Sequence, residues 1–238
     1  YLVLSFQANI FAIIISKIFN VKIISRSNSS STGWSKNFIK QIIFKYFFKK
    51  ADKIIVNSPD FQKEMDKKYR IKTECILNPF EFHRIEKLSN VKSNTIFSKG
   101  KFLKLISVGR LTDQKDFITM IRSVKLVKRK VELVILGKGH KHNHLKQYVY
   151  INNLNSKIKF LGYKKNPFKY IKQANIFLLT SKFEGSPNVL VEAQYLKKYI
   201  ISTNCPTGPK EILNNGKYGS LVKVEDHKSI ARILQNYT

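Results

Sequence analysis

Short apolar runs along the chain alternate with segments in which apolar residues recur every three or four positions. Short apolar runs are typical of strands buried in a parallel sheet, whereas the longer spacing is typical of amphipathic helices. The predicted strands are residues 2–6, 21–25, 53–57, 73–77, 102–108, 131–136, 157–161, 175–180, 199–202 and 220–224. Their alternation with helical segments predicts an α/β fold with parallel, doubly wound sheets.

A polar passage divides these elements into two groups. It covers about residues 84–100, shortly after the sequence Asn78-Pro79-Phe80, and predicts a linker between two α/β domains. We expect a partial N-terminal domain over 1–83, a linker over 84–100 and a C-terminal domain over 101–238. The first group holds only about four strands, fewer than a complete domain of this class needs, so we expect this domain to be incomplete.

Residues 184–192, Glu-Gly-Ser-Pro-Asn-Val-Leu-Val-Glu, lie between a predicted strand and a helical pattern. The unpaired N–H groups and the dipole at a helix start attract phosphate. A carboxylate on either side of such an anion site binds only uncharged partners well, and the hydroxyl groups of a sugar can donate hydrogen bonds to it. The segment therefore suggests a nucleotide sugar, with its pyrophosphate on the helix start, Glu192 on the ribose and Glu184 on the transferred sugar. The alternative is that both glutamates are ordinary surface charges.

Two other segments add to this pattern. Arg110 and Lys115 come just after the predicted strand 102–108, and a Gly/Pro-rich turn over 202–213 leads into a short helix. In their order and spacing, the three segments closely resemble the group 1 retaining glycosyltransferases, family 4, which have the GT-B fold of two Rossmann-like domains. The resemblance is strong over residues 101–225 and looser over 1–100.

The resemblance implies roles for individual residues. Arg110 and Lys115 would grip the donor diphosphate, the two glutamates would hold the donor's sugar and ribose, and Tyr163 would lie beside the nucleobase. We assign catalytic roles to Arg110, Lys115 and Glu184. We assign contacts with the donor to Gly109, Tyr163, Gly185, Ser186, Asn188, Val189, Leu190 and Glu192. Gly137 and Gly139 either let the backbone approach the nucleotide or form a tight turn.

The expected reaction transfers a hexose or N-acetylhexosamine from a UDP-sugar, with retention, to a glycan or polyprenyl-diphosphate-linked acceptor in polysaccharide or glycoconjugate synthesis. The chain contains no Asp-x-Asp pair of the kind that holds a divalent metal in many glycosyltransferases. We therefore expect no metal site and no cofactor. A sugar-nucleotide epimerase of the same fold is the alternative enzyme class.

Two departures from the family pattern affect this prediction. The N-terminal glycine-rich loop and the C-terminal helices of the family have no match here, which implies an internal fragment. Arg26 occupies or adjoins a position where many relatives carry histidine, as in the amino-sugar-transferring, polyprenyl-linked branch. Arg26 either contacts a phosphate or is a plain surface arginine. The loop over residues 27–33 is a candidate border of the acceptor site.

The chain has 44 basic and 15 acidic residues, a formal charge of +29. Such a charge suggests nucleic acid, but 37 of the basic residues are lysines and only seven are arginines, the usual residues for bidentate phosphate and base recognition. The lysines are also scattered along the whole chain. We therefore expect an anionic membrane surface as the partner and no nucleic acid, with a basic nucleic-acid-binding protein as the remaining alternative.

Residues 36–50 are the best candidate for contact with a membrane. Ile39, Ile42, Ile43, Tyr46 and Phe47 recur at helical spacing. The lysines that flank them are Lys36, Lys40, Lys45, Lys49 and Lys50. This stripe either packs on the sheet, which we favour, or lies on a membrane. Both interpretations hold together if Phe44 and Phe48 remain outside the core. No apolar run is long enough to span a bilayer, and the two cysteines are far apart. We expect a cytoplasmic protein, peripheral at the inner face of the plasma membrane.

Overall fold

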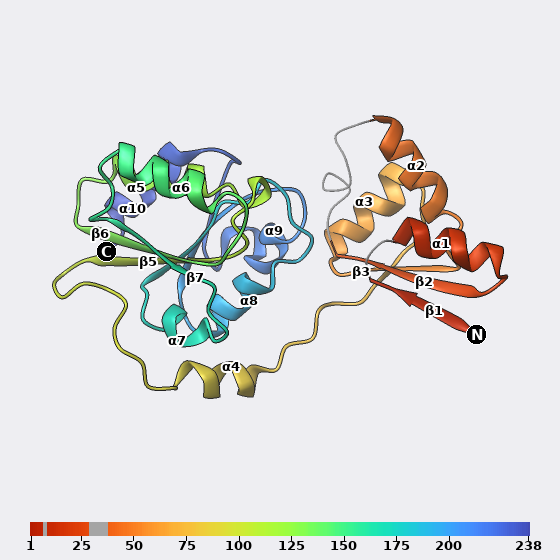
Figure 1. The fold of residues 1–238 in the computed structure, drawn as a ribbon, viewed down its shortest axis with the longest axis horizontal. Helices are drawn as coiled ribbons and strands as arrows, with labels where there is room; N and C mark the ends of the chain where they lie inside the picture. Colours follow the sequence, from red (N-terminus) through yellow and green to blue (C-terminus); the bar gives the residue numbers. More distant parts are fainter. Residues whose placement is uncertain (7–8, 29–37) are drawn as a thin grey trace. The chain divides into compact units, whose positions relative to one another are not determined.

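The computed structural model describes residues 1–6, 9–28 and 38–238. The chain forms two compact units, each with its own parallel sheet (Figure 1). Unit 1 contains residues 1–79, 183–187 and 206–211, and unit 2 contains the remainder. None of the described helices is both long and apolar enough to cross a bilayer.

The described part of unit 1 has a four-stranded parallel sheet in the order β1-β2-β3-β4. Its strands are β1 (Leu2–Ser5), β2 (Lys22–Ser27), β3 (Lys53–Val56) and β4 (Glu74–Cys75). Its helices are α1 (Asn9–Ile18), α2 (Phe38–Phe48) and α3 (Pro59–Tyr69). The start of α3 is fixed by sequence, because the Ser58 hydroxyl accepts a hydrogen bond from the Phe61 N–H and proline occupies the first turn.

Unit 2 has a six-stranded parallel sheet in the order β10-β9-β8-β5-β6-β7. Its strands are β5 (Leu103–Val108), β6 (Val131–Leu136), β7 (Ile158–Gly162), β8 (Ile176–Leu179), β9 (Tyr199–Thr203) and β10 (Ser220–Val222). Its helices are α4 (Phe82–Ser89), α5 (Phe117–Leu126), α6 (His142–Ile151), α7 (Phe168–Ile171), α8 (Asn188–Tyr195), α9 (Pro209–Ile212, shared with unit 1) and α10 (His227–Asn236). The short 3-10 helices are η2 (Asp113–Lys115) and η3 (Asn214–Gly216).

Alternation of side chains along the strands gives unit 2 three layers. Leu133 and Ile135 of β6 join one core with α5, α6 and α10. Val134 and Leu136 join a second core with α7 and α8 on the other face of the sheet (Figure 1). Both faces are covered, as expected for strands that are apolar throughout.

The segment 84–100, for which the sequence predicts a linker, is packed on unit 2. It includes most of α4, and Phe97 is buried in the same core as α7 and α8. The Ile96 N–H donates to the Gln173 side chain, and the Ser98 N–H donates to Glu132. A few apolar side chains in a polar stretch are thus enough to attach it, and unit 2 begins at Phe80.

Helix α2 differs from the favoured prediction. Phe48 is buried and Phe44 packs against the same core, whereas Ile39 and Ile42 of the predicted stripe are 65% and 51% exposed. The prediction that this stripe packs on the sheet is therefore wrong. A helix rich in apolar residues presents several possible packing faces, and the two phenylalanines fill the core of unit 1 instead. Lys36 and most of the loop 27–33 lie outside the described residues.

Candidate functional site

The order of strands in unit 2 reverses between β5 and β8, which are hydrogen-bonded neighbours in the middle of the sheet. In open parallel sheets, ligands bind outside the carboxyl ends of the strands at this reversal. Gly109 and Arg110 directly follow β5, and Thr180 directly follows β8. The predicted phosphate-binding residues thus leave the sheet at the position that the topology favours for a ligand.

The turn over residues 109–116, the Lys115 turn, is attached to the end of β8. The Thr180 hydroxyl lies 3.1 Å from the Lys115 carbonyl and 2.9 Å from the Asp116 carbonyl. The Lys182 N–H donates to the Gln114 carbonyl at 2.8 Å. A methyl group added to Gly109 would lie 3.8 Å from the Lys115 side chain. The Lys115 side chain therefore runs beside Gly109, and Arg110 is exposed.

The glycines that follow β6 serve backbone packing. A Cβ atom on Gly137 would approach the Gly109 carbonyl oxygen to 1.8 Å, and one on Gly139 would approach the Leu111 oxygen to 2.3 Å. The Leu111 N–H also donates to the Lys138 carbonyl at 3.0 Å. Gly137 and Gly139 thus let the Lys115 turn pack closely against the end of β6. This close packing explains why glycine occupies both positions.

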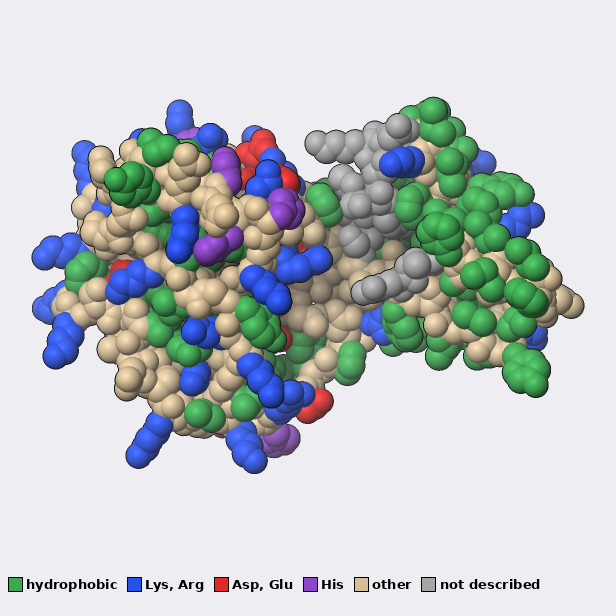
Figure 2. Space-filling model, in the orientation of Figure 1, with side chains coloured by type: hydrophobic (Ala, Val, Ile, Leu, Met, Phe, Trp, Pro, Cys, Tyr) green, Lys and Arg blue, Asp and Glu red, His purple; other side chains and the backbone are tan. Residues whose placement is uncertain are grey.

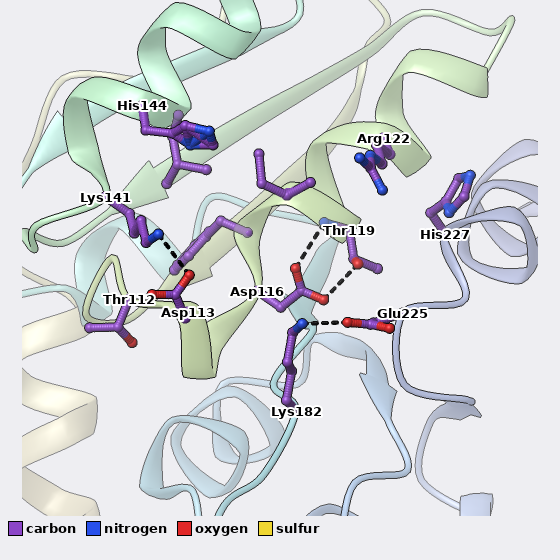
Figure 3. Close-up of a pocket in the computed structure, with 13 residues that line it drawn as sticks. Thr112, Asp113, Asp116, Thr119, Arg122, Lys141, His144, Lys182, Glu225 and His227 are labelled. Atoms are coloured by element: carbon purple, nitrogen blue, oxygen red, sulfur yellow. Dashed lines mark hydrogen bonds and ion pairs between the residues drawn. The ribbon is translucent and has the colours of Figure 1, made fainter. Parts of the chain in front are cut away.

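A cavity of about 470 Å³ lies beside the Lys115 turn (Figure 3). Its ionic groups largely neutralise one another: Lys141 pairs with Asp113 at 2.8 Å, and Lys182 pairs with Glu225. The hydrogen bond from Lys141 lowers the pKa of Asp113. Asp113 belongs to the Lys115 turn, and Lys182 follows the end of β8. The ion pairs that line the cavity therefore help to hold the Lys115 turn in place.

Asp116 connects the turn to α5. Its φ of +44° is left-handed, and its carboxylate accepts hydrogen bonds from the Thr119 N–H and, at 2.6 Å, from the Thr119 hydroxyl. Burial raises the pKa of this carboxyl group. Asparagine could make the same helix cap and tolerates this backbone conformation equally well.

We expect Asp116→Asn to flatten the pH dependence of unfolding. Because the folded-state pKa of Asp116 is raised, its contribution to stability falls as pH increases from the ordinary carboxyl pKa through the raised one. At pH 7.5 the Asn variant should match or exceed wild type in free energy of unfolding, measured with urea. Asp116→Ala should lose about 1–3 kcal/mol, since it removes the cap and keeps the positive φ. Equal losses in both variants would contradict this.

Tyr163 follows β7, next to β6. The Gly137 N–H donates to the Gly162 carbonyl at 2.9 Å, and the Tyr163 ring is exposed with the Lys138 ammonium 5.7 Å from its centre. A cavity of about 440 Å³ opens at these strand ends. It is lined by Gly137, Lys138, Gly139, His140, His142, Asn143 and Gly162.

Helix α8 carries Asn188, Val189, Leu190 and Glu192. The Leu190 side chain is buried in the core beneath the helix, whereas Asn188 is exposed. Glu192 is partly buried, and burial is the cause that raises its carboxyl pKa. A partly desolvated carboxylate has lost hydrogen bonds to water, so hydroxyl donors of a ligand would stabilise its charged form.

The loop over residues 183–187, the Glu184 loop, belongs with unit 1. Glu184 is only 6% exposed. A Cβ atom on Gly185 would lie 2.1 Å from the Asn28 carbonyl oxygen and 3.1 Å from the side-chain oxygen of Asn57. The Ser186 carbonyl accepts a hydrogen bond from Asn78 at 3.5 Å. Gly185 is therefore required by close backbone packing.

The structure thus groups the predicted residues in two sets. Glu184, Gly185 and Ser186 lie in unit 1, and Gly109, Arg110, Lys115, Tyr163 and residues 188–192 lie in unit 2. Within unit 2 it brings Lys115 beside Gly109, and within unit 1 it surrounds the Glu184 loop with asparagines that the sequence analysis missed. These asparagines are Asn28, Asn57 and Asn78, and each closely follows a strand of unit 1. Their shared position after strands is the feature of the sequence that could have identified them.

Arg26 is engaged within unit 1. Its guanidinium donates to the side-chain oxygens of Asn28 at 3.0 Å and Asn78 at 2.8 Å. A longer hydrogen bond of 3.4 Å reaches the Ile76 carbonyl. Arg26 therefore connects the ends of β2 and β4 beside the residues that hold the Glu184 loop.

Residues 90–237 match the model of the family described as "Glycosyl transferases group 1". The chain belongs to this family. It is 35% identical to an uncharacterized glycosyltransferase of Methanocaldococcus jannaschii, over 89% of this chain and 59% of that protein. It is 29% identical to N-acetylgalactosamine-N,N'-diacetylbacillosaminyl-diphospho-undecaprenol 4-alpha-N-acetylgalactosaminyltransferase of Campylobacter jejuni, over 87% of this chain and 58% of that enzyme.

Solved structures confirm the GT-B fold of this group 1 chain. Anabaena HepE in complex with UDP-glucose superposes with a TM-score of 0.82 at 18% identity, over 98% of this chain and 67% of HepE. The chain thus spans about three fifths of the curated relatives and two thirds of this structural neighbour.

Proposed function

We propose that this chain carries the donor site of a retaining glycosyltransferase that uses a UDP-hexose or UDP-N-acetylhexosamine. The acceptor is a glycan or a polyprenyl-diphosphate-linked sugar in cell-surface polysaccharide or glycoconjugate synthesis. One observation carries the proposal: the Arg110–Lys115 segment and the Glu192 helix follow β5 and β8, the two strands at the reversal of the sheet.

The donor diphosphate binds to cationic groups and helix N–H groups in this proposal. Arg110 and Lys115 supply two positive charges, and the positive end of the dipole of α8 lies at its start at Asn188. A unit charge about 4 Å from a phosphate oxygen contributes roughly 4 kcal/mol at an effective dielectric near 20. In this proposal the two cations stabilise the departing diphosphate in the place of a divalent metal.

The remaining contacts follow from the positions of the glutamates and of β7. Glu192 accepts hydrogen bonds from the two ribose hydroxyls, and Glu184 accepts from hydroxyls of the transferred sugar. The nucleobase lies at the ends of β6 and β7, where the backbone at Tyr163 can donate and accept. Gly109, Gly185, Ser186, Val189 and Leu190 contribute backbone close to the donor.

Transfer proceeds on one face of the sugar. The acceptor oxygen forms a bond to the anomeric carbon as the bond from that carbon to the phosphate oxygen breaks. The acceptor proton moves to the leaving phosphate, so UDP departs and no protein nucleophile is required. The developing charge on the diphosphate is stabilised by Arg110 and Lys115.

Two relatives support the choice of substrates. The name of the Campylobacter enzyme gives an undecaprenol-diphosphate-linked acceptor, and the HepE structure contains UDP-glucose. The test is to express the complete reading frame, supply UDP-sugars with a polyprenyl-diphosphate-linked acceptor, and identify the products. A new glycosidic bond supports the proposal, whereas an epimerised UDP-sugar without transfer would favour the epimerase.

We also propose that unit 1 contacts an anionic membrane from the cytoplasmic side. Figure 2 shows hydrophobic side chains over the visible surface of this unit. Helix α1 packs beside α2. The exposed apolar residues of the two helices are Phe11, Ile15, Ile18, Phe38, Ile39, Ile42, Ile43 and Tyr46. Lys17, Lys45 and Lys50 lie on or next to these helices and would attract anionic headgroups.

We expect Ile39→Asn combined with Ile42→Asn to lower binding to vesicles containing phosphatidylglycerol by at least roughly tenfold, because each lost isoleucine removes about 1.5–3 kcal/mol of apolar burial. Co-sedimentation with vesicles of the protein expressed from the complete reading frame measures this binding. Ile151→Asn on α6 is the matched control, since Ile151 is 66% exposed and lies in unit 2. Equal binding by all three proteins would reject this membrane face.

A further inference from the structure

Thr207 has an unusual backbone conformation for its residue type. Its φ is +61°, and among the residues that the structure describes it is the only β-branched one with a positive φ. The branched Cβ makes this region sterically unfavourable, and glycine would adopt it freely. Such conformations persist where surrounding contacts enforce them, commonly at functional sites.

The surrounding contacts lead directly to the Glu184 loop. The Thr207 hydroxyl donates a 2.7 Å hydrogen bond to the Glu184 carbonyl oxygen. The next residue, Gly208, has a φ of +91°. A Cβ atom there would come within 2.5 Å of the Gly185 carbonyl oxygen and 2.6 Å of the Pro187 ring. Residues 207 and 208 therefore follow the backbone of the Glu184 loop at contact distance.

The segment that carries Thr207 is itself fixed within unit 1. The Glu211 carboxylate accepts a hydrogen bond from the Asp60 N–H in the first turn of α3, and it also bonds the Ser58 side chain. Gly185 meanwhile packs against Asn28 and Asn57. The Glu184 loop is thus held both by the β2 and β3 ends and by the anchored segment 206–211.

We propose that Thr207 is a positioning residue for Glu184, an inference that rests on the proposed role of Glu184 toward the transferred sugar. The backbone conformation at position 207 favours glycine over threonine. We therefore attribute the presence of threonine to its hydroxyl, which bonds the Glu184 carbonyl. By fixing the Glu184 carbonyl it sets where the Glu184 carboxylate meets the sugar hydroxyls. Misplacement of such a group by about 1 Å lowers turnover roughly a hundredfold.

Three substitutions in the complete reading frame separate the hydroxyl from the backbone effect. Thr207→Val keeps the branched shape and removes the hydroxyl, Thr207→Ser keeps the hydroxyl, and Thr207→Gly removes both. We expect Val and Gly to lower kcat for sugar transfer roughly tenfold to a hundredfold while UDP affinity stays within about twofold. Ser should retain kcat within about twofold, because it keeps the hydroxyl that bonds the Glu184 carbonyl.

Hydrogen exchange of the backbone amides of residues 183–186 gives a readout independent of activity. Exchange should be about fivefold to tenfold faster in the Val and Gly variants than in wild type and Ser. Wild-type kcat in the Gly variant, or unchanged exchange in both Val and Gly, would overturn the proposal. If wild type transfers no sugar from any UDP-sugar, the proposed function fails, and exchange alone still decides whether Thr207 holds the loop.

Discussion

Glu192→Ala should lower the affinity for UDP by roughly tenfold to a hundredfold. The substitution removes the acceptor for two ribose hydroxyls, and hydrogen bonds to a charged group contribute about 1.5–3 kcal/mol. Titration calorimetry of UDP into the protein from the complete reading frame measures the change. Glu81→Ala is the control, because Glu81 is an exposed carboxylate that precedes α4 in unit 2. A folded Glu192→Ala variant with unchanged UDP affinity would reject the ribose assignment.

The pH dependence of UDP binding gives a second test of Glu192. Its pKa is raised by burial, so the carboxylate takes up a proton at a higher pH than an ordinary glutamate. A protonated carboxyl is a poorer acceptor for hydroxyls, so UDP affinity should fall as pH is lowered through that raised pKa. Glu192→Gln should bind more weakly at neutral pH and lose this dependence. An identical pH profile in both proteins would contradict the assignment.

Lys115→Ala should lower kcat for sugar transfer by roughly a hundredfold or more, and should change donor affinity less. The charge on the diphosphate increases as the glycosidic bond breaks, so a cation beside it stabilises the transition state more than the bound donor. Arg110→Lys should also be damaging, because a point charge cannot replace a guanidinium that bonds two phosphate oxygens. Steady-state kinetics with a UDP-sugar, on protein expressed from the complete reading frame, gives kcat and KM for both variants.

The same experiment with EDTA tests the predicted metal independence. If Arg110 and Lys115 stabilise the leaving group, most of the wild-type turnover should remain when divalent cations are chelated. Lys146→Ala is the matched control for charge, since Lys146 is an exposed lysine on α6 in unit 2. Complete loss of activity in EDTA that manganese restores would disprove this mechanism.

The strands were predictable because burial on both faces of a parallel sheet requires continuous apolar runs. Leu103–Val108 and Val131–Leu136 lie within one residue of their predicted bounds. The placement of Glu192 inside a helix and of Glu184 in the preceding loop also followed from local pattern, since α8 begins at Asn188. These features depend on neighbours within a few positions along the chain.

The attachment of the segment 84–100 and the packing of α2 were not predictable in the same way. Phe97 is one apolar residue in a polar stretch, and its burial depends on a core formed by residues far along the chain. In α2 the apolar residues surround much of the helix, so the sequence did not distinguish Phe44 and Phe48 from the exposed isoleucines. Which face is buried depends on the shape of the core that receives it.

The sequence by itself determined the α/β class of fold and the positions of Arg110, Lys115 and Glu192 after their strands, because periodicity and residue type act locally. Only the tertiary structure decided what holds the Glu184 loop and what Arg26 contacts. Arg26 bonds Asn78 across 52 positions, and Thr207 bonds Glu184 across 23. Such hydrogen bonds depend on where distant strand ends meet, and local pattern carries no information about that meeting.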